Sequence, residues 1–461
     1  MKWHRARICS VLALMSLGVI GAISNWANGG FSQPSGIKVD ADGVLRTLVF
    51  KDPTGQLTRQ RINAAKASLN RDLMKPSKLR KVSLNRLERE IEKLLENGEA
   101  ETDEMKFLAG LTQITHVFYL PETKDIVIAG PAEGFFETIA GRTISMSSNK
   151  STLQLQDLVV ALRCFSPDGD QKKQLGCSID PTQEGLKKMQ DFLVSVRGQV
   201  RPTNESAAAL VKGLRENLGL QTVSVFGISE KTHFAQVMVE ADYRMKMIGI
   251  GLEKPLARIP SYVSRVKPAQ VSRNALTRWY FEPDYESVVV SEDQNAMQLI
   301  GKGVRLVTEN EMVAADGIRS RSNSKDVASM AFCSAFTRHY HQMADTTAVY
   351  AELKSLIDMS IVAAFIQKED YYRRADWDME FFGDEEKFPV ETYNAPKQVE
   401  TAVNAIFKGN SLMTPVGGGV SIQPLKAVSE EKIKFDDKGK IKTVSETIKT
   451  DHLEDSQWWW D

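Results

Sequence analysis

Residues 234–248, FAQVMVEADYRMKMI, decide how the middle of this 461-residue chain folds. With a period of 3.6 residues the apolar side chains form one stripe, made of Phe234, Val237, Met238, Ala241, Met245 and Ile248. With a period of two, alternate residues from 239 to 247 form an apolar strand face and the four charges share the other face. Glu240 with Arg244 and Asp242 with Lys246 place an acid four residues before a base, as in helical ion pairs. We therefore predict a helix whose charges form a solvated face; the alternative is that they line a cleft.

The residues around this helix alternate between helical and strand patterns. Helices are predicted at 59–74, 83–97, 153–162, 182–196, 204–217, 326–343 and 349–367. Hairpins are predicted at 37–50 and 111–129, a strand at 221–227, and a strand-rich region at 277–308. This pattern indicates an α+β protein with a mixed α/β core, hairpins and a C-terminal helical pair.

A chain of this length is expected to divide into several packed units. We predict a signal peptide at 1–24, an N-terminal hairpin with helices at 25–104 and a mixed α/β core at 105–325. A helical pair at 326–370 and an irregular C-terminal region at 371–461 follow. That last region ends in Trp458, Trp459 and Trp460, which we expect to dock on the body of the protein or on a partner.

The first residues predict export. A basic start at 1–7 precedes an apolar run at 8–23 that is shorter than the ~20 residues of a membrane-spanning helix. We expect cleavage after Ser24 and a periplasmic or cell-envelope location; an uncleaved leader that anchors the chain is the alternative. Lysine plus arginine equals aspartate plus glutamate, at 59 each, so charge gives no reason to expect nucleic acid as a partner.

The cysteines bear on the same question of compartment. In an oxidising compartment Cys164 and Cys177 are candidates for a disulfide, because residues 165–170 are rich in turn formers that can bring them together. Cys333 lies in an apolar helical stretch and is expected to be a small buried side chain.

Motifs for catalysis and for cofactors are few. The sequence has no Gly-x-Ser-x-Gly, no His-Glu-x-x-His and no Cys-x-x-Cys motif, and the glycines of residues 130–134 lack the Lys-Ser/Thr of a phosphate loop. His339 and His341, two apart on a helix, point to opposite sides and cannot bind one metal ion together. We therefore predict neither a metal nor a cofactor, and a backbone turn at 130–134.

Several segments together resemble a family of exported proteins of unknown function found chiefly in planctomycete bacteria. The matching segments are 107–111, 125–134, 155–163, 177–182, 239–246 and 352–364, within a resemblance that covers about 80–370. The family brings no activity, substrate or catalytic residue; the resemblance implies export and a shared compact core. If its motifs mark a site, Glu133, Asp157 and Arg163 are the candidate binding residues, and the further polar residues to test are Glu240, Asp242, Arg244 and Lys246.

These observations favour a non-enzymatic binding or scaffold protein of the cell envelope, with an envelope protein or polymer as its partner. The alternative is a hydrolase that uses a carboxylate pair near Glu240 and Asp242, with Arg244 and Lys246 as further catalytic candidates. Buried carboxylates that converge in one pocket would favour the enzyme, whereas exposed apolar surface or a docked tryptophan tail would favour the binding protein.

Overall fold

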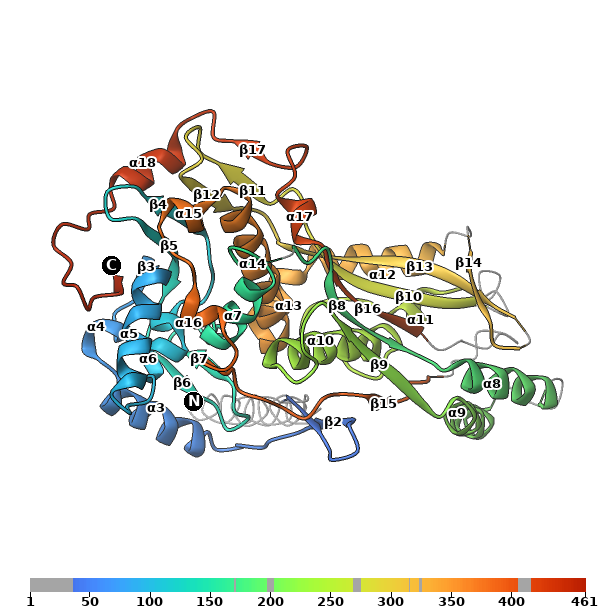
Figure 1. The fold of residues 1–461 in the computed structure, drawn as a ribbon. Helices are drawn as coiled ribbons and strands as arrows, with labels where there is room; N and C mark the ends of the chain where they lie inside the picture. Colours follow the sequence, from blue (N-terminus) through green and yellow to red (C-terminus); the bar gives the residue numbers. More distant parts are fainter. Residues whose placement is uncertain are drawn as a thin grey trace, which may run out of the picture.

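The computed structural model describes residues 36–169, 171–196, 203–267, 275–314, 316–322, 326–404 and 416–461, and it has the predicted α+β class. The predicted leader, 1–24, lies outside the described residues. Two large sheets, one at each side of the molecule in Figure 1, are separated by helices.

The first sheet has nine strands. Their spatial order is β1 (Gly36–Val39), β2 (Val44–Leu48), β15 (Gln398–Glu400), β9 (Leu220–Phe226), β8 (Leu175–Asp180), β16 (Val416–Ile422), β10 (Ala275–Pro283), β13 (Val304–Val313) and β14 (Arg319–Ser322). Neighbours are antiparallel except the pairs β2–β15 and β16–β10. The sheet confirms the hairpin predicted at 37–50, where Gly43 takes a positive φ of 80° in the turn.

The second sheet has seven strands, and a two-stranded hairpin lies apart from it. The order is β17 (Lys434–Phe435), β11 (Val288–Val290), β12 (Ala296–Leu299), β4 (His116–Leu120), β5 (Asp125–Ala132), β3 (Ser77–Ser83) and β18 (Trp459–Trp460). The hairpin pairs β6 (Phe135–Glu137) with β7 (Thr143–Ser145). Both sheets combine strands from the predicted segments 25–104 and 371–461 with strands of the predicted core, so these segments do not form separate sheets.

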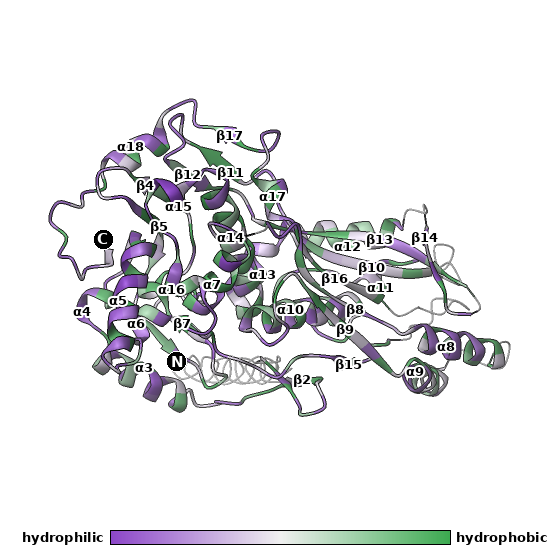
Figure 2. Ribbon diagram, viewed as in Figure 1, coloured by the Kyte–Doolittle hydropathy of each residue, from purple (hydrophilic) through white to green (hydrophobic). Residues whose placement is uncertain are grey.

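Residues 234–248 lie in the helix α10 (His233–Gly249), which confirms the helical prediction over the strand. The Thr232 side chain accepts a hydrogen bond from the Ala235 amide and caps its start. One side of α10 packs on β8 and β16, and the other on α14 (Ala348–Lys368) and α7 (Leu155–Arg163). These apolar helices run through the middle of Figure 2.

The predicted solvated face of α10 is wrong. The exposed fractions of Glu240, Asp242, Arg244 and Lys246 are 1%, 0%, 3% and 1%. The helix has the sheet on one side and two helices on the other, so these four charges are covered and each needs a partner inside the protein.

The remaining helices cover the edges and ends of the two sheets. Near the N-terminus are α3 (Gln56–Ser68), α4 (Arg71–Met74), α5 (Leu84–Glu96), α6 (Asp103–Lys106) and the 3-10 turn η1 (Leu108–Gly110). Further along are α8 (Gln183–Ser195), α9 (Asn204–Leu218), α11 (Tyr262–Arg265), α12 (Val327–Arg338) and α13 (Tyr340–Thr346). Towards the C-terminus are α15 (Tyr371–Arg374), α16 (Glu380–Gly383), α17 (Pro424–Ala427) and α18 (Lys440–Glu446). The expected helical pair is thus α12–α13 and α14, and α8 packs against α9 around a small core of its own.

The predicted irregular C-terminal region instead completes both sheets. Its glycine-rich stretch is the central strand β16, in which Gly417, Gly418 and Gly419 are buried between β8 and β10. A Cβ atom at Gly418 would lie 1.8 Å from the Trp279 carbonyl oxygen, and one at Gly419 would lie 2.0 Å from that of Cys177. The glycines therefore allow the backbones of the neighbouring strands to approach closely.

The tryptophan-rich end docks on the body of the protein. Trp459 and Trp460 form β18, which pairs with β3, and Trp458 and Trp460 are buried. The Asp461 side chain accepts two hydrogen bonds from Arg80, at 2.9 and 3.0 Å, and the Arg80 guanidinium lies 4.8 Å from the centre of the Trp459 ring. Trp458 and Trp460 are therefore part of the hydrophobic core, and the partly buried Trp459 packs against it.

The predicted Cys164–Cys177 disulfide is not present. Both residues are free, buried thiols, as is Cys333. Cys177 lies in the middle of β8 between two neighbouring strands, whereas Cys164 ends α7 and points its sulfur at the Gly227 carbonyl oxygen, 3.8 Å away. The turn between them joins a helix to a strand and does not place the two side chains face to face.

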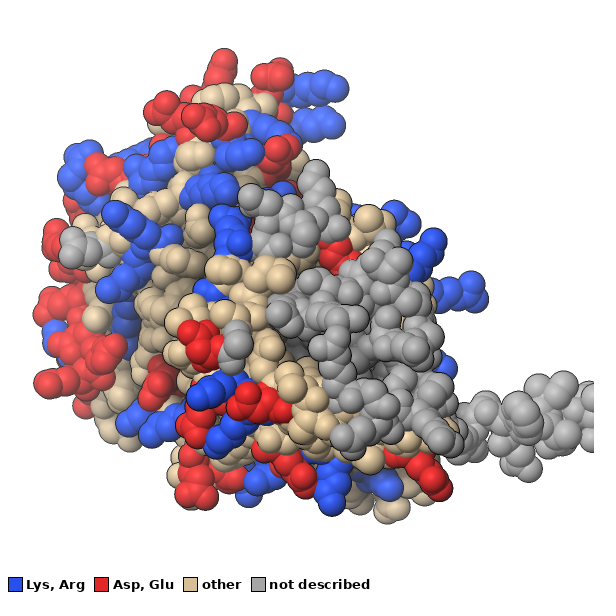
Figure 3. All heavy atoms as spheres, turned by 90° about the vertical axis from the view of Figure 1, so that its right-hand side faces the viewer, with Lys and Arg blue, Asp and Glu red and all other residues tan. Residues whose placement is uncertain are grey.

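The surface is mixed in charge. On the face turned to the viewer in Figure 3, basic and acidic side chains of the described residues are interspersed. Among the described residues, no helix has both the length and the apolar character that a membrane crossing requires.

Candidate ligand-binding cleft

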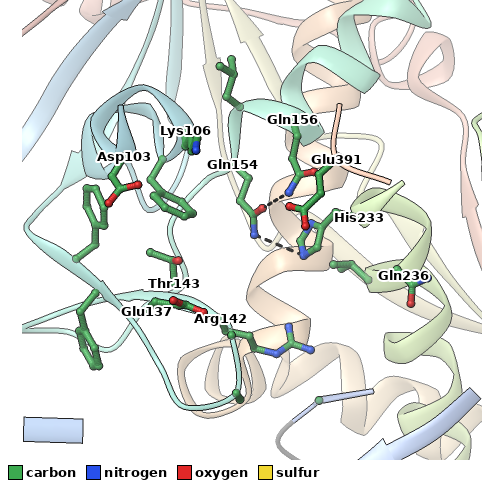
Figure 4. A pocket seen from close by; sticks show the side chains of 18 of the residues that line it. Asp103, Lys106, Glu137, Arg142, Thr143, Gln154, Gln156, His233, Gln236 and Glu391 are labelled. Carbon is green, nitrogen blue, oxygen red and sulfur yellow. Dashed lines mark hydrogen bonds between the residues drawn. The ribbon is translucent and has the colours of Figure 1, made fainter. Parts of the chain in front are cut away.

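A cleft with a volume of about 1070 Å³ opens between several distant parts of the chain. Its walls come from α3, α6, the β6–β7 hairpin, the starts of α7 and α10, and residues 388–393. Figure 4 shows side chains from these distant parts of the sequence facing one space. The lining combines amide and carboxylate groups with the rings of Phe107, Phe135 and Tyr393, a mixture typical of ligand sites.

An aspartate–histidine pair stands at the back of the cleft. Asp157, in the first turn of α7, lies 2.8 Å from the Nδ1 atom of His233, the first residue of α10. Burial alone lowers the pKa of His233, but the charge of Asp157 and their hydrogen bond outweigh it and raise the pKa above its usual value. Asp157 was predicted as a binding residue; the structure makes it the partner that orients the histidine.

A chain of polar side chains leads from this histidine to the mouth of the cleft. Gln154 Nε2 lies 3.5 Å from His233 Nε2, and the Gln154 carbonyl oxygen accepts a 2.6 Å hydrogen bond from Gln156. Gln156 also donates to the Tyr393 hydroxyl at 3.4 Å, and that hydroxyl donates to Glu391 at 2.9 Å. Figure 4 shows Gln154, Gln156 and Glu391 gathered beside His233. Between His233 and Glu391 this wall therefore presents the neutral amides of Gln154 and Gln156 and the hydroxyl of Tyr393.

Three buried charges form a second cluster beside the histidine. Arg142, from the β6–β7 hairpin, donates to Glu240 on α10 and to Glu352 on α14. Glu352 also accepts a 3.1 Å hydrogen bond from the Ser151 hydroxyl. Burial raises the pKa of Glu352, but the Arg142 charge outweighs it and holds the pKa below its usual value. Arg142 thus ties the hairpin to two central helices and favours the ionised form of Glu352.

The other acid–base pair of α10 points away from the cleft. Lys246 Nζ donates to Asp242 at 2.7 Å and to the Ile179 carbonyl oxygen of β8 at 3.0 Å. Burial raises the pKa of Asp242 to about 6, an effect that the Lys246 charge partly offsets. Because residues two apart on a helix differ by about 200° in direction, Glu240 and Asp242 lie on opposite sides of α10. The carboxylate pair expected for a hydrolase does not converge.

Arg244 lies on the same side of α10 as Glu240, about one helical turn further along. Its guanidinium donates to Glu253 at 2.7 Å and to Glu240 at 3.4 Å. Burial alone lowers the pKa of Arg244, but its hydrogen bonds and the charge of Glu253 raise the pKa above its usual value. Arg244 does not line the cleft, so it is a partner that holds Glu240 and not a group that reaches a ligand.

The two other predicted binding residues lie outside the cleft. Arg163 donates to backbone carbonyl oxygens of Phe382 and Phe388, at 2.7 and 2.6 Å, and so holds the loop after α16. Glu133 accepts a hydrogen bond from the Ser148 hydroxyl. Burial alone raises the pKa of Glu133, but hydrogen bonds from neighbouring serine hydroxyls outweigh burial and lower the pKa. Gly130, Pro131 and Ala132 continue β5, so the chain turns only at Glu133 and Gly134.

The sequence reasoning missed His233, Arg142 and Glu352. One signal was available for Glu352, since it is an acid within the apolar helical run 348–368. Nothing near Arg142 or His233 distinguishes them from surface residues, because their partners are 76 to 210 positions away. Among the described residues, no group of three or more His, Cys, Asp or Glu side chains is arranged to hold a metal ion.

Comparison with known proteins identifies one family. Residues 177–262 match the family described as "Protein of unknown function (DUF1598)". The matched segment runs from β8 through α10 to the first residue of α11, so it contains His233 and Glu240 but neither Arg142 nor Glu352. No curated protein and no solved structure matched this chain. The segment is therefore similar to a domain of unknown function, and its family contributes no activity.

Proposed function

We propose that this is an exported protein of the cell envelope that acts by binding a partner in the cleft and not by catalysis. The observation that carries the proposal is the cleft itself, about 1070 Å³ in volume and lined by amides, carboxylates and aromatic rings from six parts of the chain. Its size and mixed lining are those of ligand sites. Export is supported by the basic and then apolar start of the sequence.

The buried acids of the cleft support binding over hydrolysis. Glu240 and Glu352 both pair with Arg142, so these two carboxylates are already engaged within the protein. Asp242, the other half of the expected pair, is held by Lys246 on the opposite side of α10. A partner would therefore meet charges that are already held in ion pairs within the protein.

Variants of α3 test the binding role without disturbing the core. No residue of α3 is buried, and Ala64 lines the cleft whereas Ala67, on the same helix, is exposed and does not. Ala64→Trp should fill the cleft, and Ala67→Trp is its matched control. Tagged residues 25–461 would be incubated with an envelope fraction, and the retained material compared among wild type and the two variants.

We expect wild type and Ala67→Trp to retain the same material and Ala64→Trp to lose it. Equal retention by all three would overturn the role of the cleft. Export is tested separately by cell fractionation; an intact leader on protein found only in the cytosol would overturn that part of the proposal.

A hydrolase remains the second candidate because of one observation, the imidazole of His233 at the cleft, oriented by Asp157 as a general base would be. Purified wild type would be screened against ester, glycoside and peptide substrates beside His233→Asn, Glu240→Gln and Asp242→Asn. Turnover by wild type that is lost in His233→Asn would support the enzyme and overturn the purely binding role. Turnover at background level would remove the hydrolase.

A further inference from the structure

We infer that the cleft takes a neutral, hydroxyl-rich ligand, namely a stretch of carbohydrate chain. The inference rests on the proposed binding function and adds the chemical class of the ligand. Three properties of the cleft carry it: the pairing of its charges, the unused capacity of its amides, and its exposed ring surfaces.

The deep charges of the cleft are already paired within the protein. Arg142 is shared by Glu240 and Glu352, and His233 is paired with Asp157. At the mouth, Arg61 of α3 lies 3.3 Å from Glu137 of β6. The remaining charged lining groups are Glu101, Asp103, Lys106 and Glu391, which are half-buried or exposed and carry both signs. A charged ligand group at the back of the cleft would compete with these internal pairs, whereas a neutral group leaves them intact.

The amides of the cleft have hydrogen-bonding capacity that the protein does not use. Gln154 has two N–H donors, and its only partner for them among the described residues is His233, at the limiting distance of 3.5 Å. Gln236 uses its N–H on the Asn394 carbonyl oxygen at 2.7 Å, which leaves its own carbonyl oxygen to accept. A hydroxyl group both donates and accepts, so it matches an amide in either direction. Closely spaced hydroxyls can therefore satisfy both glutamines.

Ring surfaces complete the match to a sugar. Phe107 and Tyr393 are half-buried and line the cleft, and Phe107 leans on the buried Phe135 with ring centres 5.3 Å apart. The Tyr393 ring in turn lies 5.9 Å from the His233 ring. A pyranose has an apolar C–H face and a polar rim, so one ring can pack on an aromatic face while its hydroxyls reach the glutamines.

The test is isothermal titration calorimetry of the mature chain with three neutral tetrasaccharides, cellotetraose, maltotetraose and chitotetraose. Tetragalacturonate serves as the acidic carbohydrate probe and an end-blocked neutral tetrapeptide as the peptide probe. We expect binding of at least one neutral tetrasaccharide, weakened about three- to tenfold by Gln154→Ala and by Gln236→Ala, the usual effect of one lost neutral hydrogen bond. Gln174→Ala is the matched control, since Gln174 is an exposed glutamine outside the cleft that donates to Ser421 at 2.9 Å.

The outcomes separate the ligand class from the binding role. Failure of all three neutral tetrasaccharides overturns the carbohydrate inference, as does binding that Gln154→Ala, Gln236→Ala and Gln174→Ala leave equal. If the peptide or the acidic probe binds instead and Ala64→Trp abolishes that binding, the cleft is a binding site for another class and the proposed function stands. Equal urea midpoints for all variants exclude loss of folding as the cause.

Discussion

Replacing Lys246 by methionine tests whether the charges of α10 are buried as described. The Lys246 and Asp242 side chains are 2% and 0% exposed, and their charged atoms lie 2.7 Å apart. Lys246→Met keeps most of the apolar stem but leaves the Asp242 carboxylate without its cation. Breaking a buried pair in this way costs about 3–5 kcal/mol, because one charge remains uncompensated in the interior.

The pH dependence of this loss follows from the pKa of Asp242. Burial raises that pKa from 3.8 to about 6, so the native protein binds this proton more tightly than the unfolded chain does. Stability therefore falls as pH rises from about 4 through 6, by about 3 kcal/mol for this group alone. Without Lys246 the pKa should rise further, so the cost of Lys246→Met should shrink as the pH is lowered and Asp242 becomes neutral.

Urea unfolding followed by tryptophan fluorescence measures the effect, since Trp279 is buried against Gly249 at the end of α10. The matched control is Lys188→Met. Lys188 pairs with Glu184 at the same spacing of four residues and at 2.6 Å, but the two side chains are 59% and 76% exposed. We expect the control to keep the wild-type midpoint. The double variant Asp242→Leu with Lys246→Met should recover most of the stability, because neither position then leaves an unpaired charge in the interior.

The reasoning is refuted if Lys246→Met shifts the urea midpoint no more than Lys188→Met does. The pair would then behave as the solvated helical pair that its sequence spacing indicates. Equal losses for Lys246→Met at pH 5 and pH 8 would contradict the part of the argument that concerns the pKa of Asp242.

Three further predictions concern other parts of the fold. Asp157→Asn should lower the pKa of His233, because the Asp157 charge raises it; an NMR titration measures the change. The stability that this pair adds is complete at acid pH and is lost as pH rises through the His233 pKa. Arg80→Met should lower the free energy of unfolding by about 3 kcal/mol or more, measured in urea. It removes the hydrogen bonds to four backbone carbonyl oxygens and the partner of Asp461. An unchanged urea midpoint would show that β18 is held without Arg80. Gly130→Ala should cost about 1–3 kcal/mol or more, because the new Cβ would lie 1.9 Å from a neighbouring carbonyl oxygen, and wild-type stability would show that β5 is not packed as described.

Local sequence signals predicted much of the secondary structure. Ser83 was predicted to begin a helix, and its hydroxyl does accept from the Arg86 amide at the start of α5. The hairpin predicted across residues 121–124 joins β4 to β5. Features of this kind depend on residues only a few positions apart, so a single sequence contains what is needed to find them.

The candidate site could be predicted only in fragments. Asp157 and Glu240 were selected as polar residues within matched segments, but nothing in the sequence assigned them His233 and Arg142 as partners. The same gap explains the errors. The charges of α10 were expected to be solvated, and the region that contains β16 was expected to be irregular. Nothing nearby in the sequence shows which strands and helices pack against these residues.

The sequence by itself determined that α10 is a helix, that its acids and bases are spaced to pair, and that strands and helices alternate along an α+β chain. The tertiary structure alone decided which charges are buried, which side of α10 faces the cleft, and that the last tryptophans join a sheet. The physical reason is how far apart in the sequence the interacting residues are. Helix caps, turns and i to i+4 pairs are satisfied within a few residues, whereas burial and charge pairing depend on segments that folding brings together from hundreds of positions apart.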